Sequence, residues 1–235
     1  MIKLYSTIGV RGAVEALLPA AEAKVGDKVA VKIDVTWATA PMLVKRLQAG
    51  ETADIMILNA AGMETVTASG WIVPGSQAEL ASSGVGIAVK AGAPKPDIST
   101  PEALKKTLLA AKSISYSDPE AGGASGIYFA KLIERMGIAE QVNAKKIFPP
   151  PAGFCAEFLL TGQAELAIQQ RPELMHVKGV EIIGGLPGDL DVVTVFIGGL
   201  ATACKDQKAG KALLDFLRSA EAKAMFKEKG LMTPA

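Results

Sequence analysis

The fold of this protein rests on the stretch Ser113-Ile-Ser-Tyr-Ser-Asp-Pro-Glu-Ala-Gly-Gly-Ala-Ser-Gly-Ile-Tyr-Phe-Ala130. At its start, Ile114 and Tyr116 alternate with serines, which is the two-residue period of a β-strand. The pair Asp118-Pro119 then favours a turn, so we expect the strand to stop near Ser117.

The second half of the stretch predicts a helix that begins with a glycine-rich turn. Gly122 and Gly123 can adopt positive φ without a Cβ clash, Ser125 is suited to cap the first turn, and Gly137 ends the helix. Such a turn presents backbone N–H groups that lack helical partners at the positive end of the helix dipole. The stretch therefore predicts an anion cradle, although an ordinary strand-to-helix connection with a serine cap is the alternative. The expected apolar face of the helix is Phe129, Leu132, Ile133 and Met136.

Polar side chains follow three strands expected in the first part of the chain. Ser6 and Thr7 follow a strand over 2–5, Thr39 follows a strand over 29–35, and Asn59 ends a continuous apolar run over 54–59. Each is followed by a helical pattern, and alternating strands and helices predict a parallel α/β sheet. Because ligands of such sheets lie at the carboxyl ends of the strands, we expect these three loops to share one rim.

The remaining pattern predicts a second lobe that the chain enters near residue 82 and leaves along a long strand over 191–201. We expect lobe 1 to comprise residues 1–81 and 196–235 and lobe 2 to comprise residues 82–195. The other expected elements are a strand over 83–90, a helix from Pro101 capped by Thr100, an apolar strand or loop over 146–148, a stiff turn over 149–153, a helix over 154–160, a buried strand over 164–170, a strand over 180–183, and helices over 207–218 and 221–229. Two lobes joined by two crossovers form a hinged clamp.

The amino-acid composition argues against several classes of partner. The 25 Lys and Arg residues balance the 24 Asp and Glu residues, and no basic run occurs, so we expect no nucleic acid partner. No apolar run reaches the length of a membrane span, so we expect no membrane insertion. Cys155 and Cys204 are predicted to be small buried hydrophobes, and with one histidine, His176, the chain offers no metal site. We expect a monomer without a cofactor.

Three segments together resemble a known family: Gly92-Ala-Pro-Lys-Pro-Asp-Ile-Ser-Thr-Pro-Glu-Ala103, Ser115-Tyr-Ser-Asp-Pro-Glu-Ala-Gly-Gly-Ala-Ser-Gly126 and Ala164-Glu-Leu-Ala-Ile-Gln-Gln170. They are similar to type II periplasmic solute-binding proteins, in the molybdate-binding-like branch, which also resembles bacterial aconitate isomerase. The resemblance runs from Lys3 to the C-terminus. It implies an α/β fold of two lobes, joined by two crossover strands, with a ligand cleft between them.

The resemblance also implies which residues bind the ligand. Molybdate binders hold the oxyanion with hydroxyl and backbone N–H groups of the first loop, the second loop, the glycine-rich helix start and a later segment. The matching positions here, with two arginines and an asparagine that the sequence adds, are Ser6, Thr7, Arg11, Thr39, Asn59, Gly123, Ala124, Ser125, Gly153, Gln170 and Arg171.

One difference from the molybdate binders bears on the chemical class of the ligand. Where molybdate binders supply a tyrosine hydroxyl, this chain has Gln170, flanked by Gln169 and Arg171. A planar guanidinium can donate two parallel hydrogen bonds to one carboxylate, which favours an organic acid over molybdate. The alternative for Arg171 is a surface ion pair with Glu173 or Glu165. The alternative for Arg11, beside the first loop, is an ordinary exposed arginine in a first helical turn.

These observations favour a binding protein that closes on a small di- or tricarboxylate and passes it to an ABC transporter permease, if it is exported. We expect the periplasm if a leader was removed and the cytoplasm if the chain starts natively at Met1; the resemblance favours the periplasm. The alternatives are molybdate or oxyanion binding and a cofactor-free isomerase of an unsaturated polycarboxylate such as aconitate. A ligand sensor without its DNA-reading module ranks last. For an isomerase the catalytic residue is unknown, and the candidates for a proton carrier are Glu157, Cys155, His176 and Ser125.

Overall fold

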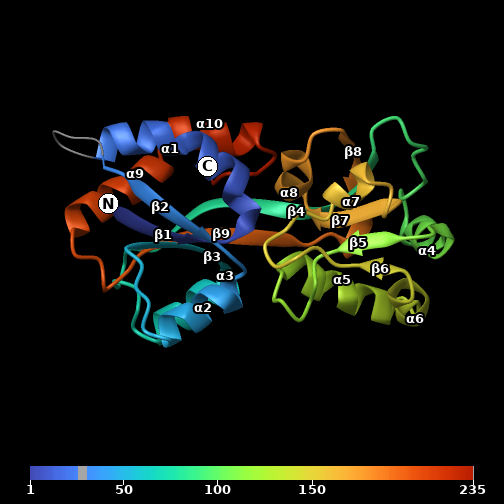
Figure 1. Ribbon diagram of the computed structural model, residues 1–235, viewed down its shortest axis with the longest axis horizontal. Coiled ribbons are helices and arrows are strands. Elements are labelled where there is room, and N and C mark those ends of the chain that lie inside the picture. Colours follow the sequence, from blue (N-terminus) through green and yellow to red (C-terminus); the bar gives the residue numbers. More distant parts are fainter. Residues whose placement is uncertain (26–30, 235) are drawn as a thin grey trace. The chain divides into compact units, whose positions relative to one another are not determined.

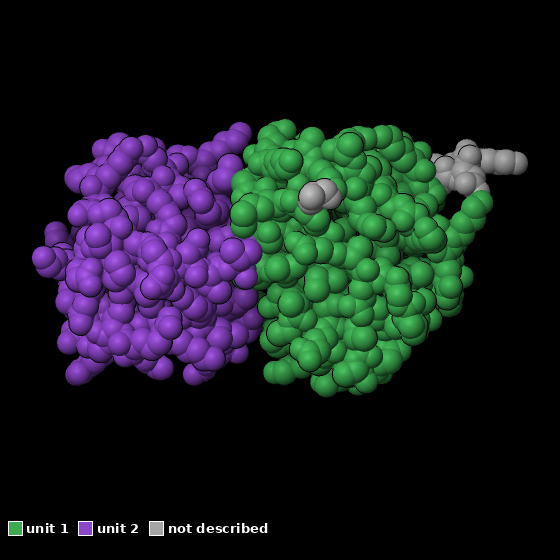
Figure 2. Space-filling model, turned by 180° about the vertical axis from the view of Figure 1, so that it is seen from behind, with its two compact units in different colours: residues 1–82, 194–235 green, residues 83–193 purple. Residues whose placement is uncertain are grey.

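Figure 1 shows the fold in a computed structural model that describes residues 1–25 and 31–234. The chain divides into two compact units, which Figure 2 colours separately. Unit 1 contains Met1–Ser82 and Thr194–Ala235, and unit 2 contains Ser83–Val193. The chain passes between the units twice, within β4 (Ala78–Lys90) and at the start of β9 (Val193–Leu200).

Unit 1 is built on a mixed sheet with the strand order β2-β1-β3-β9-β4. β1 (Ile2–Ser6) lies parallel to β2 (Ile33–Trp37) and to β3 (Ile55–Asn59), and β9 runs antiparallel to β3. Each parallel strand leads into a helical segment, as the alternating pattern predicts. The carboxyl ends of β1, β2 and β3 therefore lie at one edge of the sheet.

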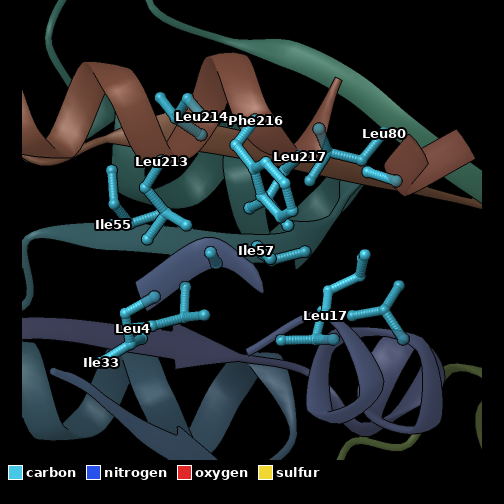
Figure 3. Close-up of a cluster of buried hydrophobic side chains, with 14 of the residues drawn as sticks. Leu4, Leu17, Ile33, Ile55, Ile57, Leu80, Leu213, Leu214, Phe216 and Leu217 are labelled. Carbon is cyan, nitrogen blue, oxygen red and sulfur yellow. The ribbon is translucent and has the colours of Figure 1, made fainter. Parts of the chain in front are cut away.

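Alternate residues of β3 point to opposite faces of the sheet and pack into two separate cores in unit 1. Ile55 and Ile57 join the cluster drawn in Figure 3, whereas Met56 and Leu58 join a second cluster on the other face. The first face is covered by α1 (Arg11–Val25), α9 (Gln207–Leu217) and α10 (Ala220–Glu228), and the second by α2 (Ala40–Gln48) and α3 (Ala60–Ala68) (Figure 1). A sheet covered on both faces explains why the run over 54–59 is apolar throughout.

Unit 2 has the strand order β4-β7-β5-β6, and β8 (Val180–Gly185) also pairs with β4. β5 (Ile114–Tyr116) is parallel to β7 (Leu166–Gln170) and to the short β6 (Lys146–Ile147). β4 is antiparallel to β7, with Val85 opposite Gln170. The carboxyl ends of β5 and β7 therefore share one edge.

Unit 2 also packs helices on both faces of its sheet. One core contains apolar residues of α4 (Pro101–Ala110), α5 (Ala124–Arg135) and α6 (Ala139–Asn143), and the other contains residues of α7 (Glu157–Leu160) and α8 (Arg171–His176). Tyr116 anchors the first core, with its ring edge-on to Phe129 at 4.9 Å between centroids. Its hydroxyl donates to Asn143 Oδ1 at 2.7 Å, so this large ring is buried with its polar group satisfied. The described residues also form the 3-10 turns η1 (Ile8–Val10) and η2 (Gly188–Leu190).

Most elements lie where the sequence predicts them, and the differences concern boundaries. β4 begins at Ala78 rather than at residue 83, and the helix expected over 154–160 is limited to Glu157–Leu160. Residues 29 and 30 of the strand expected over 29–35 lie outside the described residues. α6 and α8 are helices that the sequence pattern did not indicate, and Pro19 lies inside the continuous α1.

Within the described part of the chain, no helix combines the length and the apolar character needed to cross a membrane.

Candidate functional site

The predicted residues of unit 1 meet at the carboxyl edge of its parallel strands. Ser6, the last residue of β1, pairs with Trp37 of β2 and with Ile57 of β3. Beyond the strands, the Ala38 N–H donates to the Ser6 carbonyl at 3.2 Å, and the Thr7 N–H donates to the Ile57 carbonyl at 3.0 Å. These bonds tie the first loop to both neighbouring strands. Ser6 and Thr7 thus share a rim with Thr39, the N-cap residue of α2, as predicted.

The Thr7 hydroxyl is the least satisfied group of this rim. Thr7 is 8% exposed, and its Oγ1 has no hydrogen-bond partner among the described residues. By contrast, the fully buried Ser6 donates its hydroxyl hydrogen to the Thr7 carbonyl at 3.1 Å. Leaving a buried hydroxyl unpaired costs about 1–3 kcal/mol. A ligand acceptor at this rim would remove that cost.

Two other predicted residues of unit 1 have structural roles. Arg11 pairs through Nε with Glu15 Oε1 at 2.8 Å, and its guanidinium carbon lies 5.7 Å from the centroid of the Trp37 ring. Asn59 is the N-cap of α3, and its Oδ1 accepts from the Gly62 N–H at 3.0 Å. The arginine is thus held beside β2, and the asparagine carbonyl is already used by the backbone.

A glycine that the sequence analysis did not single out shapes the start of the same rim. A Cβ at Gly9 would lie 2.4 Å from Cζ of Phe196, so only glycine lets the turn after Thr7 pack against β9.

In unit 2, the predicted helix start is present, but its cap differs from the expectation. Gly123 rather than Ser125 is the N-cap residue of α5, and no side chain caps this end. Ser125 lies inside the first helical turn and is 3% exposed, so its predicted capping role is wrong. Gly122 has the expected positive φ of 80°, whereas Gly123 has φ −66°.

Close packing explains why this helix begins with small residues. A Cβ at Gly126 would lie 2.0 Å from the Ser117 carbonyl oxygen, and one at Gly123 would lie 3.0 Å from Ser117 Cβ. The start of α5 therefore lies directly against the end of β5. The first N–H groups of the helix, beginning at Ala124, have no helical acceptor and can bind an anion.

The stiff turn over 149–153 is held against β7 by one buried amide. The Gly153 N–H donates to the Pro150 carbonyl at 2.8 Å, and the preceding Ala152 has a φ of 62°, which is unusual for a residue other than glycine. Gln169, fully buried in β7, accepts from the Cys155 N–H at 2.9 Å and donates to the Gly153 carbonyl at 3.1 Å. In the sequence, Gln169 stands out only as a neighbour of Gln170. Its clamping role could not be read from sequence, because Gly153 and Cys155 contact it only after folding.

Gln170 and Arg171 lie at the end of β7, as predicted, with Gln170 buried and Arg171 exposed. The alternative role of Arg171, an ion pair with Glu173 or Glu165, is wrong. Among the described residues, Glu165 pairs instead with Lys112, whose Nζ is 4.0 Å away. Glu173 is 5% exposed and belongs to the interior of unit 2.

Glu173 is a functional candidate that the sequence analysis missed. Burial raises the pKa of its carboxyl to about 8, and hydrogen bonds from the Gln169 side chain and the Gln170 backbone limit the rise. The carboxyl is therefore largely protonated at neutral pH. No local pattern marks it, because an acidic residue in the first turn of a helix is usually exposed.

The residues considered as proton carriers differ in their burial and their contacts. Cys155 is fully buried, and burial raises the pKa of its thiol to about 12; burial likewise raises that of Cys204 to about 11. Both thiols are buried, as predicted, and neither is a reactive thiolate. Glu157 is exposed, and His176 ends α8 with its ring stacked on Phe154 at 4.5 Å between centroids. No group of three or more His, Cys, Asp or Glu residues in the described ranges could hold a metal ion.

Unit 2 also contains a cavity of about 690 Å³ away from the predicted residues. It lies between the proline-rich loop over 93–96, α4 and the start of β7, and its lining is mainly apolar. Leu166 at the start of β7 lines this cavity, whereas Gln170 ends the same strand. The cavity is therefore separate from the edge at which β5 and β7 end.

Comparisons with known proteins agree with this fold. The chain is 31% identical over 234 residues to an aconitate isomerase from Pseudomonas sp., covering 98% of this chain and 87% of the relative. The periplasmic molybdate-binding protein of Azotobacter vinelandii superposes with a TM-score of 0.81 at 15% identity, covering 100% of both chains. The sulfate-binding protein SubI of Mycobacterium tuberculosis gives a TM-score of 0.74 at 15% identity, covering 98% of this chain and 85% of its own. The expected type II periplasmic-binding-protein fold is thus confirmed. Since residues 2–232 match the family profile described as bacterial extracellular solute-binding protein, the chain belongs to that family.

Proposed function

We propose that this protein binds a small organic di- or tricarboxylate, and that aconitate is the first ligand to test. The observation that carries the proposal is the Thr7 hydroxyl, which is buried without a partner on a rim that it shares with Ser6 and Thr39. A buried donor of this kind is satisfied by an acceptor from a ligand.

The donors of unit 2 support an anionic ligand. The start of α5 has no side-chain cap, so its N–H groups and the positive end of its dipole favour negative charge. Arg171 is exposed and, among the described residues, forms no ion pair. We propose that the donors of both units contribute to the affinity for the anion: Ser6, Thr7, Thr39, Ala124, Ser125, Gly153, Gln170 and Arg171.

A carboxylate is preferred over a tetrahedral oxyanion for two reasons. A guanidinium fork matches the two oxygens of a carboxylate, and amide side chains add neutral donors. The relative at 31% identity is an aconitate isomerase, whose substrate is a tricarboxylate.

Isothermal titration calorimetry with trans-aconitate, cis-aconitate, citrate, malonate, molybdate and sulfate tests this proposal. We expect heat with at least one polycarboxylate and a 10- to 100-fold weaker affinity for Thr7→Val, about 1–3 kcal/mol for a lost buried hydrogen bond. Thr65→Val is the matched control, since Thr65 is exposed on α3 and donates to the Ala61 carbonyl. Heat with molybdate or sulfate alone would contradict the carboxylate assignment, and an unchanged affinity of Thr7→Val would contradict the rim.

The second candidate is isomerisation of aconitate, and the 31% identity across 98% of the chain is the observation that favours it. Moving the double bond requires removal of an allylic proton and its return at another carbon, while donors hold the carboxylates. Proton NMR of cis-aconitate in heavy water with added protein distinguishes the candidates. An isomerase produces the trans isomer or exchanges the allylic proton, whereas a binding protein leaves the spectrum unchanged.

As a binding protein, the chain would act as a monomer in the periplasm and deliver its ligand to an ABC transporter permease. The periplasmic location and the delivery of ligand rest on family membership. Light scattering during size-exclusion chromatography tests the monomer. Ligand-dependent uptake by membrane vesicles that contain the permease tests delivery.

A further inference from the structure

The 690 Å³ cavity of unit 2 is not used by the proposed polycarboxylate site. It is lined by Val89 near the end of β4 and by Leu166 at the start of β7, two strands that run antiparallel. The cavity therefore lies at the end of the sheet opposite the carboxyl ends of β5 and β7. Its volume falls within the range of small-molecule binding sites, about 300–1,000 Å³.

One wall of the cavity, the loop over 93–96, is held in place at both of its ends. The Ala93 N–H donates to the Lys90 carbonyl at 3.0 Å, which closes the turn after β4. The Thr107 hydroxyl donates to the Asp97 carbonyl at 2.7 Å, which joins the other end of the loop to α4. The two prolines of the loop fix the φ angles at their positions. The cavity is therefore formed before any ligand binds.

The interior of the cavity is apolar. Val89, Leu159 and Leu166 line it and are themselves buried, so they form its floor. At its margin, Leu160 is 40% exposed, and the Leu160 carbonyl accepts from Nζ of the lining residue Lys90 at 3.3 Å. An alkyl chain on this floor would remove apolar surface from water, which favours binding.

The charged side chains that line the cavity are mainly positive. Lys90, Lys95 and Lys106 line it, together with one acidic residue, Glu165. Glu165 is directed to a backbone donor, because its Oε2 accepts from the Lys112 N–H at 2.8 Å. The lining therefore favours a ligand with a negative charge.

Lys106 is the lysine most available to a ligand. Lys95 pairs with Glu181 of β8, and Lys90 donates to a backbone carbonyl. Lys106 lies on α4 and, in the part of the chain that the structure describes, forms no ion pair. A carboxylate at the mouth of the cavity would supply its counter-charge.

We propose that this cavity binds an amphipathic monocarboxylate, with the alkyl chain on the apolar floor and the carboxylate at Lys106. A di- or tricarboxylate fits poorly, because a second carboxylate on this floor would lose its hydration without gaining a donor. The inference goes beyond the proposed function and does not depend on it.

Calorimetry with hexanoate, octanoate and decanoate, each below its micelle concentration, tests the apolar floor. We expect the affinity to rise by up to about fourfold for each added methylene. The same affinity for all three chain lengths, or no binding of decanoate, would overturn the proposal.

A pair of lysine variants tests the position of the carboxylate. Lys106→Gln should weaken octanoate binding by about two- to fivefold and leave the binding of the neutral octan-1-ol unchanged. Lys131→Gln is the matched control, since Lys131 is an exposed lysine on α5 and does not line the cavity. Equal octanoate affinities of Lys106→Gln and the wild type would overturn the assignment to Lys106.

A pair of tryptophan variants tests the location. Ala110 is exposed at the end of α4 and lines the cavity, so Ala110→Trp can fill the space without disturbing the core. Losing the burial of two methylenes already weakens decanoate binding by about tenfold, and we expect Ala110→Trp to lose at least this much. Ala16→Trp, at an exposed alanine of α1 in unit 1, should bind as the wild type does. Unchanged decanoate binding by Ala110→Trp would overturn the proposal.

Competition with trans-aconitate separates this inference from the proposed function. Excess trans-aconitate should leave decanoate bound, and decanoate should shift the amide NMR signals of Val89, Thr107 and Leu166. Competitive displacement of decanoate by trans-aconitate would overturn the separate site. A protein that binds decanoate in this way and binds no polycarboxylate would refute the proposed function and support the cavity.

Discussion

Substitution of Gly126 by alanine tests how closely α5 must pack against β5. Gly126 is a buried residue in the first turn of α5, and a Cβ there would lie 2.0 Å from the Ser117 carbonyl oxygen and 2.7 Å from its carbonyl carbon. These atoms belong to the backbone, so they cannot move aside as the end of a flexible side chain could. Either the helix or the end of β5 must shift by about 1.4 Å to restore ordinary contact.

Two opposing effects determine the sign of the change in stability. Alanine gains up to about 1 kcal/mol in helix propensity over glycine. Overpacking of a rigid core costs about 1–3 kcal/mol and sometimes more, and a contact this short lies at the upper end. We therefore expect Gly126→Ala to lower the free energy of unfolding by about 2 kcal/mol or more. The shift also moves the first N–H groups of α5 away from Ser117, so anion affinity should fall as well.

Urea unfolding followed by circular dichroism measures the stability change, and calorimetry measures the affinity. Gly137→Ala is a matched control on the other end of the same helix. Gly137 has a φ of 68° and nothing within 4 Å of its missing Cβ, so alanine there costs about 1 kcal/mol through backbone strain alone. A Gly126→Ala protein as stable as the wild type, with unchanged affinity, would refute close packing of α5 against the end of β5.

Three further changes have definite expected outcomes. Because burial raises the pKa of Glu173 from 4.5 to about 8, the native state keeps a proton that the unfolded chain releases, and wild-type stability falls as pH rises from about 5 to 8. Denaturant titrations of the wild type and Glu173→Gln should diverge by about 4 kcal/mol between pH 5 and pH 9, and parallel profiles would show that this carboxyl is not buried as described. Thr100→Ala removes the acceptor of the Ala103 N–H, 3.1 Å away, and should cost about 1 kcal/mol in urea unfolding; no loss would contradict the cap. Phe226→Ala empties a fully buried position in unit 1 and should cost about 3–5 kcal/mol in the same assay, whereas the partly exposed Leu109→Ala should cost less than about 1 kcal/mol.

Features that depend on neighbouring residues in the chain could be predicted from the sequence. The apolar run over 54–59 predicted a strand buried on both faces, and the structure places β3 there between two cores. The Thr100-Pro101 pair predicted a helix start with a hydroxyl cap, and the Thr100 side chain caps α4. The parallel order of the first three strands places Ser6, Thr7 and Thr39 on one rim because carboxyl ends of parallel strands share an edge.

Features that depend on distant residues could not be predicted in this way. Ser125 has the local character of a capping residue, yet close packing of Gly126 on Ser117 draws it into the first helical turn. Glu173 was expected at the surface because its charge and its position in a first turn favour exposure. It is buried because α8 packs against β7 and β8.

The sequence by itself determined most of the strands and helices, the parallel order of the first three strands and the polar loops, since periodicity and turn chemistry act over a few residues. Only the tertiary structure decided which polar groups are satisfied. Gln169 reaches Cys155 fourteen residues away, and Thr7 is left without a partner among the described residues. The free energy of a buried hydroxyl, amide or carboxyl depends on the atoms that surround it after folding, and these come from segments that no local pattern brings together.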